Sequence, residues 1–357
     1  MKIFKDRITE NIKMCELSGY HIMIVSKYFK TIKDFINLEL LCKKFGGNME
    51  KFHFNPIPLN CNTLGYFPNI ETLHLWDVED ENFGNGFMIN RKENKDIENE
   101  VVLKREFYQI IVWFNVDFET VDRNISRNIK FKNVTYTKND REKFGNNIPS
   151  SVTSIGDDCF SGCNNINRIT IPLSVTSIGK SCFNKCSSLS NVTIPSSVTS
   201  INDYCFNRCS SLSNVILPSS VTSIGKGCFR GCSSLSSVTI QSSVTLINDY
   251  SFFGCSNLSS VNIPSSVTSI GIYCFNECNS LTSITIPSSV TSINDYCFNG
   301  CSSLSNVILP SSVTSIGKSC FRGCNSLSSI TIPLSVKSIG EYCFPSNTVV
   351  YRANEII

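Results

Sequence analysis

A 23-residue period governs the second half of the chain and limits it to one kind of architecture. A Cys-Phe pair returns at this spacing, and Ser251-Phe252 keeps the register at the single interruption. The pairs are Cys159-Phe160, Cys182-Phe183, Cys205-Phe206, Cys228-Phe229, Cys274-Phe275, Cys297-Phe298, Cys320-Phe321 and Cys343-Phe344. A unit this short cannot bury its apolar side alone, so successive units must stack as coils. The period favours an extended contact surface over a catalytic cleft.

Each unit contains the pattern of one short strand. In the copy that begins at Ile201, Val215 and Leu217 alternate with polar neighbours, which is typical of a strand with one buried face. Pro218 ends this strand, because proline cannot donate to a central ladder. Val221 and Ile224 then return along a second wall, and residues 203–209 form a crossing turn. Stacking places like residues above like, so the nine phenylalanines from Phe160 to Phe344 are expected to form one internal column.

The chain also contains an internal duplication. Residues 199–232 and 291–324 differ only at Arg208/Gly300 and Gly227/Ser319, and they lie 92 residues, or four periods, apart. A solenoid can lengthen by such copying because each coil contacts only its neighbours. A single active site gains nothing from it.

The repeated run I-G/N-x-x-C-F-x-x-C-x-x-L-x-x-V-x-I-P-x-x-V-x-x, over residues 148–347, resembles the BspA-like (Treponema-type) leucine-rich repeats. Cysteine stands in most copies where that family usually has alanine. The resemblance implies an α/β repeat fold, a leucine-rich-repeat solenoid with a parallel β-sheet and about nine 23-residue coils, and a protein-binding or, when exported, an adhesive role. The lysine- and asparagine-rich N-terminal part is similar to that of such proteins in amoebic protists such as Entamoeba.

Composition divides the chain near Asn147. Residues 1–147 hold 22 Lys/Arg and 21 Asp/Glu, against 10 and 8 in residues 148–357. We therefore expect a helical N-terminal cap over residues 1–62 and irregular leucine-rich-repeat-like coils with a charged insertion over residues 63–147. Residues 148–357 then hold the regular repeats and a closing strand.

The cysteines allow three interpretations. Seven coils carry Cys-x-x-x-Cys, so adjacent coils could offer thiolates to zinc, or neighbouring coils could form a ladder of disulfides. Free cysteine is also a small and commonly buried hydrophobe. Ser251 and Asn347 replace one cysteine of a pair, which would leave Cys255 and Cys343 without partners. Packed, reduced thiols are favoured, with no metal and no cofactor.

Candidate protein-binding residues lie between the inward strand positions and in the crossing turns. The strand column is small and polar, with Ile216 and Ile308 as exposed apolar exceptions. Gly or Asn at the start of each turn, as in Gly225 and Asn202, is attributed to a positive φ or an Asx turn. The candidates are Arg168, Asn191, Thr193, Asn214, Ile216, Thr239, Asn262, Thr285, Asn306 and Ile308 on the strands, and Tyr204, Tyr250 and Tyr296 in the turns.

Other function classes find little support. His21, His53 and His74 occur in no catalytic or metal-binding spacing, and no phosphate-binding glycine loop is present, so no enzyme is expected. The net charge of +3, and the lack of aromatics among basic residues on the strands, argue against nucleic acid. No secretory signal or membrane span is expected, which predicts a cytoplasmic protein with a protein partner and an undetermined oligomeric state.

Two alternative functions stay open. The apolar pattern of residues 20–45 predicts two or three short amphipathic helices, and Leu41-Cys42-Lys43-Lys44-Phe45 looks like the end of an F-box, although the leading Leu-Pro segment is missing. Such a segment would make the protein a substrate receptor of a ubiquitin ligase. A surface adhesin is the other alternative, and its sequons at Asn124, Asn133, Asn191 and Asn257 would then be open to glycans.

Overall fold

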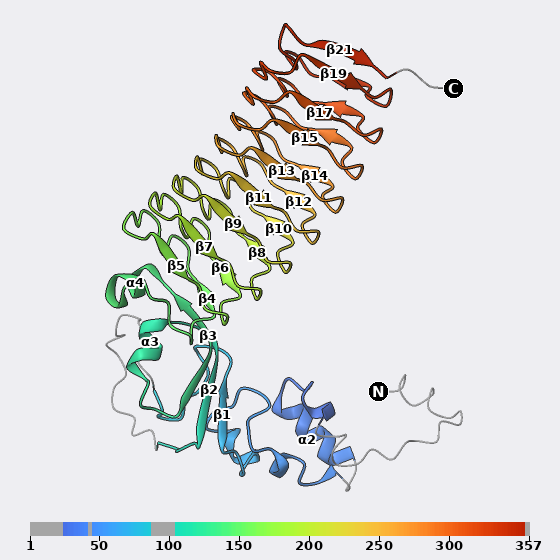
Figure 1. The fold of residues 1–357 in the computed structure, drawn as a ribbon. Coiled ribbons are helices and arrows are strands. Elements are labelled where there is room, and N and C mark those ends of the chain that lie inside the picture. Colours follow the sequence, from blue (N-terminus) through green and yellow to red (C-terminus); the bar gives the residue numbers. More distant parts are fainter. Residues whose placement is uncertain (1–23, 42–44, 87–103, 354–357) are drawn as a thin grey trace, which may run out of the picture. The chain divides into compact units, whose positions relative to one another are not determined.

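A computed structural model describes residues 24–41, 45–86 and 104–353 of the chain, which divides into two compact units, Met1–Asn133 and Val134–Ile357 (Figure 1). The composition break at Asn147 lies inside the second unit, and the three-part division drawn from it stays a prediction. Among the described residues, no helix is long and apolar enough to cross a membrane.

The first unit packs short helices and strands around a cluster of phenylalanines. Phe35 is fully buried and meets Phe29, Phe52 and Phe67 edge to face, with ring centroids 5.0 to 5.7 Å apart. This is the ordinary preference of inequivalent aromatic rings. The elements are α2 (Ile32–Leu41), the 3-10 turns η2 (Met49–Lys51) and η3 (Leu64–Tyr66), β1 (Thr72–Leu75), β2 (Gln109–Asp117) and α3 (Phe118–Arg123); β1 pairs with β2 in parallel.

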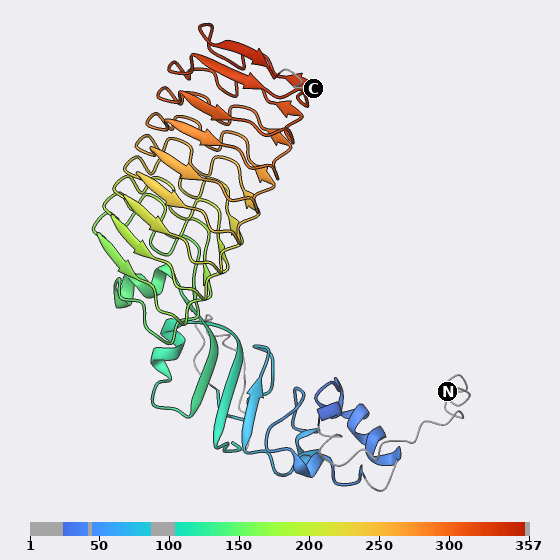
Figure 2. The same ribbon diagram turned by 45° about the vertical axis from the view of Figure 1, so that its right-hand side comes forward.

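The second unit is a parallel β-solenoid with two strand-bearing walls (Figure 2). Strand β3 (Ile129–Tyr136) crosses the division between the units and pairs with β4; α4 (Lys138–Phe144) follows it, with Thr137 and Asp140 forming a capping box. One wall holds two-residue strands, β4 (Ser154–Ile155), β6 (Ser177–Ile178), β8 (Ser200–Ile201), β10 (Ser223–Ile224), β12 (Leu246–Ile247), β14 (Ser269–Ile270), β16 (Ser292–Ile293), β18 (Ser315–Ile316) and β20 (Ser338–Ile339).

The opposite wall, which we call the sheet face, carries the longer strand of each coil. Its regular strands pair in parallel with a register shift of 23 residues, as in Val192↔Val215, so equivalent residues stand in columns. The last pair, Ser329↔Val349, is shifted by 20 residues. They are β5 (Arg168–Thr170), β7 (Asn191–Thr193), β9 (Asn214–Ile216), β11 (Ser237–Thr239), β13 (Ser260–Asn262), β15 (Ser283–Thr285), β17 (Asn306–Ile308), β19 (Ser329–Ile332) and β21 (Val349–Arg352). In all, the chain makes about eleven turns, so the predicted leucine-rich-repeat solenoid is confirmed and less regular turns join the nine regular coils.

The phenylalanine column is present as predicted. Its rings stack from Phe160 to Phe344 with centroids 5.3 to 5.7 Å apart and interplanar angles of 15° or less. Tyr136 extends the column at 6.3 Å from Phe160. The rings are nearly parallel because each has the same backbone setting as the next, unlike the edge-to-face rings of the first unit. This column is the core of the solenoid.

The explanation offered for glycine at the start of the crossing turn is wrong. The positive φ falls two residues later, at Tyr204 (56°) and Gly227 (57°), and not at Asn202 or Gly225. Glycine is needed because the coils approach closely there: a Cβ on Gly225 would lie 2.5 Å from the carbonyl carbon of Asn202 in the preceding coil. Asn202 instead uses its Nδ2 to donate to the carbonyl oxygen of Ile178 at 2.7 Å.

Candidate functional site

The sheet face presents the predicted outward column to solvent. In the sheet-face strands β5, β7, β9 and β11, the central Val or Ile is buried and both neighbours are exposed. The isoleucines are the apolar exceptions in this column, with Ile216 67% exposed and Ile308 52% exposed. The structure thus brings one set of the predicted residues together on one face: Arg168, Asn191, Thr193, Asn214, Ile216, Thr239, Asn262, Thr285, Asn306 and Ile308, all exposed.

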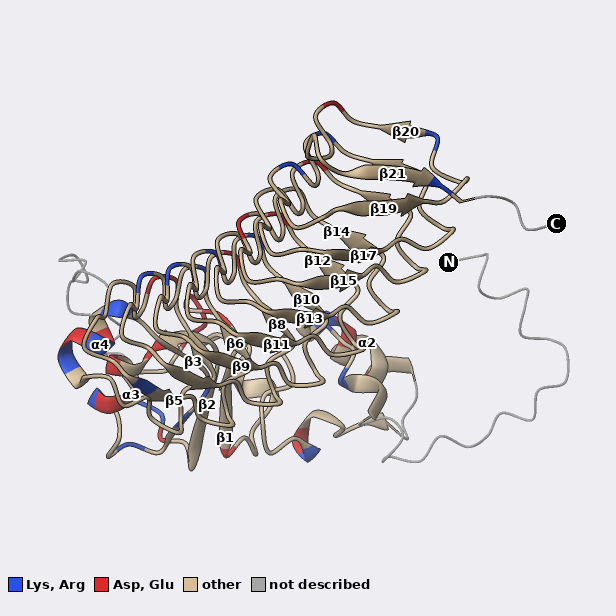
Figure 3. Ribbon diagram, turned by 45° about the horizontal axis from the view of Figure 1, so that its top comes forward, with Lys and Arg blue, Asp and Glu red and all other residues tan. Residues whose placement is uncertain are grey.

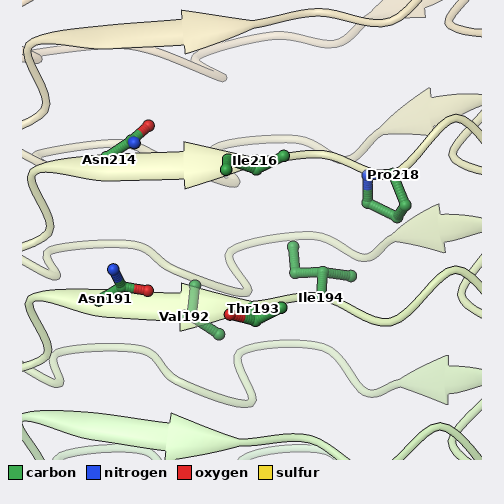
Figure 4. Close-up of a pocket in the computed structure, with 7 residues that line it drawn as sticks. All are labelled: Asn191, Val192, Thr193, Ile194, Asn214, Ile216 and Pro218. Carbon is green, nitrogen blue, oxygen red and sulfur yellow. The ribbon is translucent and has the colours of Figure 1, made fainter.

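Each exposed isoleucine borders a shallow hollow. A hollow of about 210 Å³ lies between β7 and β9, where Asn191 and Thr193 face Asn214 and Ile216 across two coils, with Pro218 beyond them (Figure 4). A second hollow of about 510 Å³ lies five coils away, between β17 and β19, bordered by Asn306, Ile308, Ser311, Ser329, Thr331 and Pro333 among others. The duplication repeats the isoleucine, whereas the hollows differ: the first lies between Ile216 and the preceding strand, and the second between Ile308 and the following strand.

Charge is nearly absent from the sheet face and gathers elsewhere. Figure 3 shows Lys, Arg, Asp and Glu of the solenoid concentrated along one edge, where the crossing turns run. Arg168 in β5 is the charged exception among the candidate residues of the sheet face. A partner of the sheet face would consequently meet hydroxyl, amide and apolar groups rather than ions.

The tyrosines predicted to bind lie on that edge and not on the sheet face. Tyr250, Tyr273 and Tyr296 stack with ring centroids 5.1 and 4.5 Å apart, and each is half-buried with a φ near 55° to 58°. Tyr204 packs against Gly227, where an added Cβ would come within 2.5 Å of its ring. Tyr273 was not among the predicted residues, because it follows Gly271-Ile272 and not an Asn-Asp pair. The candidate residues thus form two separate surfaces.

A further aromatic cluster in the first unit was not anticipated. His74 stacks on Phe54 at 5.2 Å and lies between Trp76 and Trp113, whose Nε1 donates to His74 Nδ1 at 3.3 Å. Lys132 lies over the Trp113 ring at 5.4 Å. Partial burial and the charge of Lys132 lower the pKa of His74. Both tryptophans of the chain are in this cluster. Because tryptophan is enriched at interfaces, their positions in the sequence could have indicated a candidate contact site here.

The repeat cysteines are buried in two columns beside the phenylalanines. Cys209 Sγ donates to the carbonyl oxygen of Phe183 in the preceding coil at 3.0 Å, and Cys232 and Cys255 repeat the same bond. Burial raises the pKa of Cys255 to about 12, so the thiol stays protonated at neutral pH. In the other column, Ser251 replaces the first cysteine of its coil, and its hydroxyl donates to the carbonyl oxygen of Gly225 in the preceding coil. The described thiols are free, and the described residues contain no group of three or more ligands that could hold a metal.

These features place the protein in the class of parallel solenoids built from short repeats. The residues that differ from one coil to the next lie on its exposed surfaces. The family model described as BspA type leucine rich repeat region (6 copies) matches residues 130–259 and 222–350. The chain therefore belongs to the BspA-type leucine-rich repeat family. No curated protein matches it.

Solved structures with similar chains are bacterial leucine-rich repeat proteins. The Treponema pallidum leucine-rich repeat protein is 28% identical, covering 50% of this chain and 76% of that chain, with a TM-score of 0.37. A leucine-rich repeat protein from Bacteroides ovatus is 27% identical, covering 63% and 84%, with a TM-score of 0.35. A leucine rich cell surface protein from Faecalibacterium prausnitzii is 23% identical, covering 68% and 83%, with a TM-score of 0.34.

Proposed function

We propose that the protein is a non-enzymatic protein-binding scaffold that uses the sheet face. The observation that carries the proposal is the pair of exposed isoleucines, Ile216 and Ile308, each beside a hollow on a face that is mostly polar and carries little charge. Burying one isoleucine contributes about 1.5 to 3 kcal/mol to association. The surrounding Asn, Ser and Thr side chains supply hydrogen bonds that orient the partner.

The duplication makes this surface bivalent. The two anchors are four coils apart, so with roughly 5 Å per coil they lie about 20 Å from each other. A partner that carries two apolar side chains at this spacing engages both at once, and the second contact forms at high effective concentration. Residues 199–232 and 291–324 keep the anchors, whereas both of their differences, at positions 208/300 and 227/319, fall in the crossing turns.

Affinity purification with mass spectrometry, using matched variants, tests the proposal. The double variant Ile216→Thr/Ile308→Thr restores the residue found at equivalent positions such as Thr193 and Thr239. The control Ile272→Thr removes an isoleucine that is 39% exposed on the crossing-turn edge. We expect a partner to be recovered with the wild type and the control, and to fall at least tenfold with the double variant. Equal recovery with all three proteins contradicts the proposal.

A second candidate function rests on helix α2. Leu40 and Leu41 at its end are 79% and 80% exposed, and Tyr28 before it is 80% exposed. Exposed apolar residues on a short helix suit the adaptor contact of an F-box-like segment. Residues 20–23 and Cys42, Lys43 and Lys44 of that segment lie outside the described residues. Co-purification of a ubiquitin-ligase adaptor, lost in Leu40→Ser/Leu41→Ser, supports this role; the absence of an adaptor with the wild type refutes it.

We further propose that the scaffold acts in the reducing cytoplasm, where the columns of free thiols are stable. The alternative, an exported adhesin, would expose sequons to glycosylation. Asn124 is unsuited to a glycan in the folded state, because it is buried and its Nδ2 donates to the carbonyl oxygen of Thr120 at 2.7 Å. Asn191 and Asn257 are exposed. A mass that falls after glycosidase treatment of the native protein would overturn the cytoplasmic assignment.

A further inference from the structure

Three basic residues lie on successive coils of the crossing-turn edge, away from the sheet face. The backbone N–H of Lys185 donates to the carbonyl oxygen of Asn207 at 2.7 Å, and that of Arg208 donates to the carbonyl oxygen of Arg230 at 2.6 Å. Lys185 and Arg208 occupy the same position in successive coils, and Arg230 lies in the third coil one residue before the equivalent Gly231. We call this set the basic stripe. Lys185 and Arg208 are exposed, and Arg230 is half-buried.

The basic stripe is maintained at a conformational cost. Lys185 and Arg208 each adopt a φ of 59°, in the left-handed region that disfavours residues with a Cβ. Five other coils place glycine at this position, Gly162, Gly231, Gly254, Gly300 and Gly323, at φ 68° to 78°, and one places Glu277 there, at φ 58°. The left-handed conformation costs a side-chain-bearing residue on the order of 1 to 2 kcal/mol. A strained backbone in place of an available glycine points to a role for the side chain.

Aromatic rings hold one of the cations in position. The Arg230 guanidinium lies over the Phe253 ring at 4.9 Å and over the Tyr250 ring at 5.9 Å. Lys226, from the same coil as Arg230, also lies over the Tyr250 ring, 5.7 Å from its centroid. A guanidinium that lies over an aromatic ring keeps its N–H groups available to hydrogen-bond an anion, so Arg230 can bind one while it contacts Tyr250 and Phe253.

Carboxylates of the neighbouring turns are engaged with backbone rather than with the basic stripe. Asp203 Oδ1 accepts from the N–H of Lys226 at 2.8 Å, and Asp249 Oδ1 accepts from the N–H of Ile272 at 2.8 Å. Within the described ranges, no ion pair includes a residue of the basic stripe. The charge of the stripe is therefore available to an external anion.

We propose that the basic stripe binds an acidic segment of a protein partner, independently of the sheet face. Three cations across two coil spacings match a short run of Asp or Glu, and the flanking Tyr250 and Phe253 can pack against its side chains. A nucleic acid is the poorer fit, because tight backbone binding draws on many more phosphate contacts than three cations can make.

The duplication supplies a matched control for the test. Arg230 and Arg322 occupy the same position in the two copies, each within Cys-Phe-Arg-Gly-Cys, but the neighbour equivalent to Arg208 is Gly300 in the second copy. Binding is measured by fluorescence anisotropy with a labelled twelve-residue Glu-rich peptide that contains one Tyr. An oligodeoxythymidine of twelve nucleotides is the competing probe.

We expect the peptide to bind the wild type and to weaken as salt is raised. Arg230→Glu should weaken binding at least tenfold, whereas Arg322→Glu should change it less than twofold. Arg208→Gly introduces the residue of the second copy and relieves the strained φ, so it should weaken binding without lowering the melting temperature. Ile216→Thr/Ile308→Thr should leave peptide binding unchanged, which separates this proposal from the sheet-face function.

Three results overturn the proposal. One is the lack of peptide binding by the wild type at low salt. Another is an equal loss in Arg230→Glu and Arg322→Glu, which would indicate a general charge effect. The third is binding of the oligonucleotide in preference to the peptide, which would assign the stripe to nucleic acid.

Discussion

The Cys-Phe pair illustrates how a neighbour decides what one residue does. Phe252 lies in the internal column between Phe229 and Phe275, with ring centroids 5.5 and 5.3 Å away. Phe253, the next residue, is half-buried on the crossing-turn edge under Arg230. Chemically identical side chains on consecutive residues therefore contribute to different properties, the first to stability and the second to the surface.

Truncating these two phenylalanines should have very different effects on stability. Phe252→Ala removes a fully buried ring and leaves a cavity in the column, so we expect the free energy of unfolding to fall by about 3 to 5 kcal/mol. Phe253→Ala removes a surface contact of about 1 kcal/mol or less. Thermal unfolding of both variants by calorimetry checks the contrast. Similar melting temperatures for the two variants would show that the column does not stabilise the solenoid as described.

At the scale of an element, the crossing turns come in alternating kinds that depend on each other. An Asn-Asp turn such as Asn202-Asp203 is followed in the next coil by a Gly turn, where Gly225 fits against the Asn202 peptide and Lys226 N–H donates to Asp203. The next Gly turn repeats this, with Ile272 N–H donating to Asp249. The structural repeat of the crossing turns is thus two coils long, although the strand pattern repeats in every coil.

The thiol columns should make stability depend on alkaline pH. Burial raises the pKa of Cys343 to about 11 and those of Cys159 and Cys186 to about 12, against 9.0 for a free thiol. Above pH 9 the unfolded chain loses thiol protons that the folded chain keeps, so the free energy of unfolding falls as pH rises from 9 towards 12. Each such thiol contributes a slope of up to about 1.4 kcal/mol per pH unit.

Urea unfolding between pH 8 and pH 11 measures this slope. The variant Cys255→Ala removes one titrating thiol, and its stability should fall less steeply with pH than that of the wild type. Ser251→Cys adds one and should fall more steeply. Identical slopes for the three proteins would exclude the buried thiols as the cause of alkaline destabilisation.

At the scale of the whole molecule, the fold does not require a fixed number of coils. Each coil contacts its neighbours, so stability is approximately a sum over coils and their interfaces. Deleting residues 209–300 joins Arg208 to Cys301 and removes four whole periods, 92 residues, without a shift of register. The shortened protein should fold with a similar circular dichroism spectrum and a lower free energy of unfolding.

An out-of-register deletion is the control for that prediction. Removing residues 209–290 brings the strand after the junction out of phase with the coils before it, so apolar positions would turn to solvent. We expect this protein to aggregate or to remain unfolded. Equal folding of the two deletions would mean that register between coils is not what holds the solenoid together.

The sequence by itself determined the repeat, the inward and outward strand positions and the phenylalanine column, because a 23-residue period forces equivalent residues to stack. It could not reveal why Gly225 is glycine or that the Tyr250 ring lies beside Arg230 from the coil before. It also could not show that His74 meets Trp113 or that Lys185, Arg208 and Arg230 form one stripe. Those facts depend on the spacing between coils and on contacts between residues far apart in the chain, which only the tertiary structure decides.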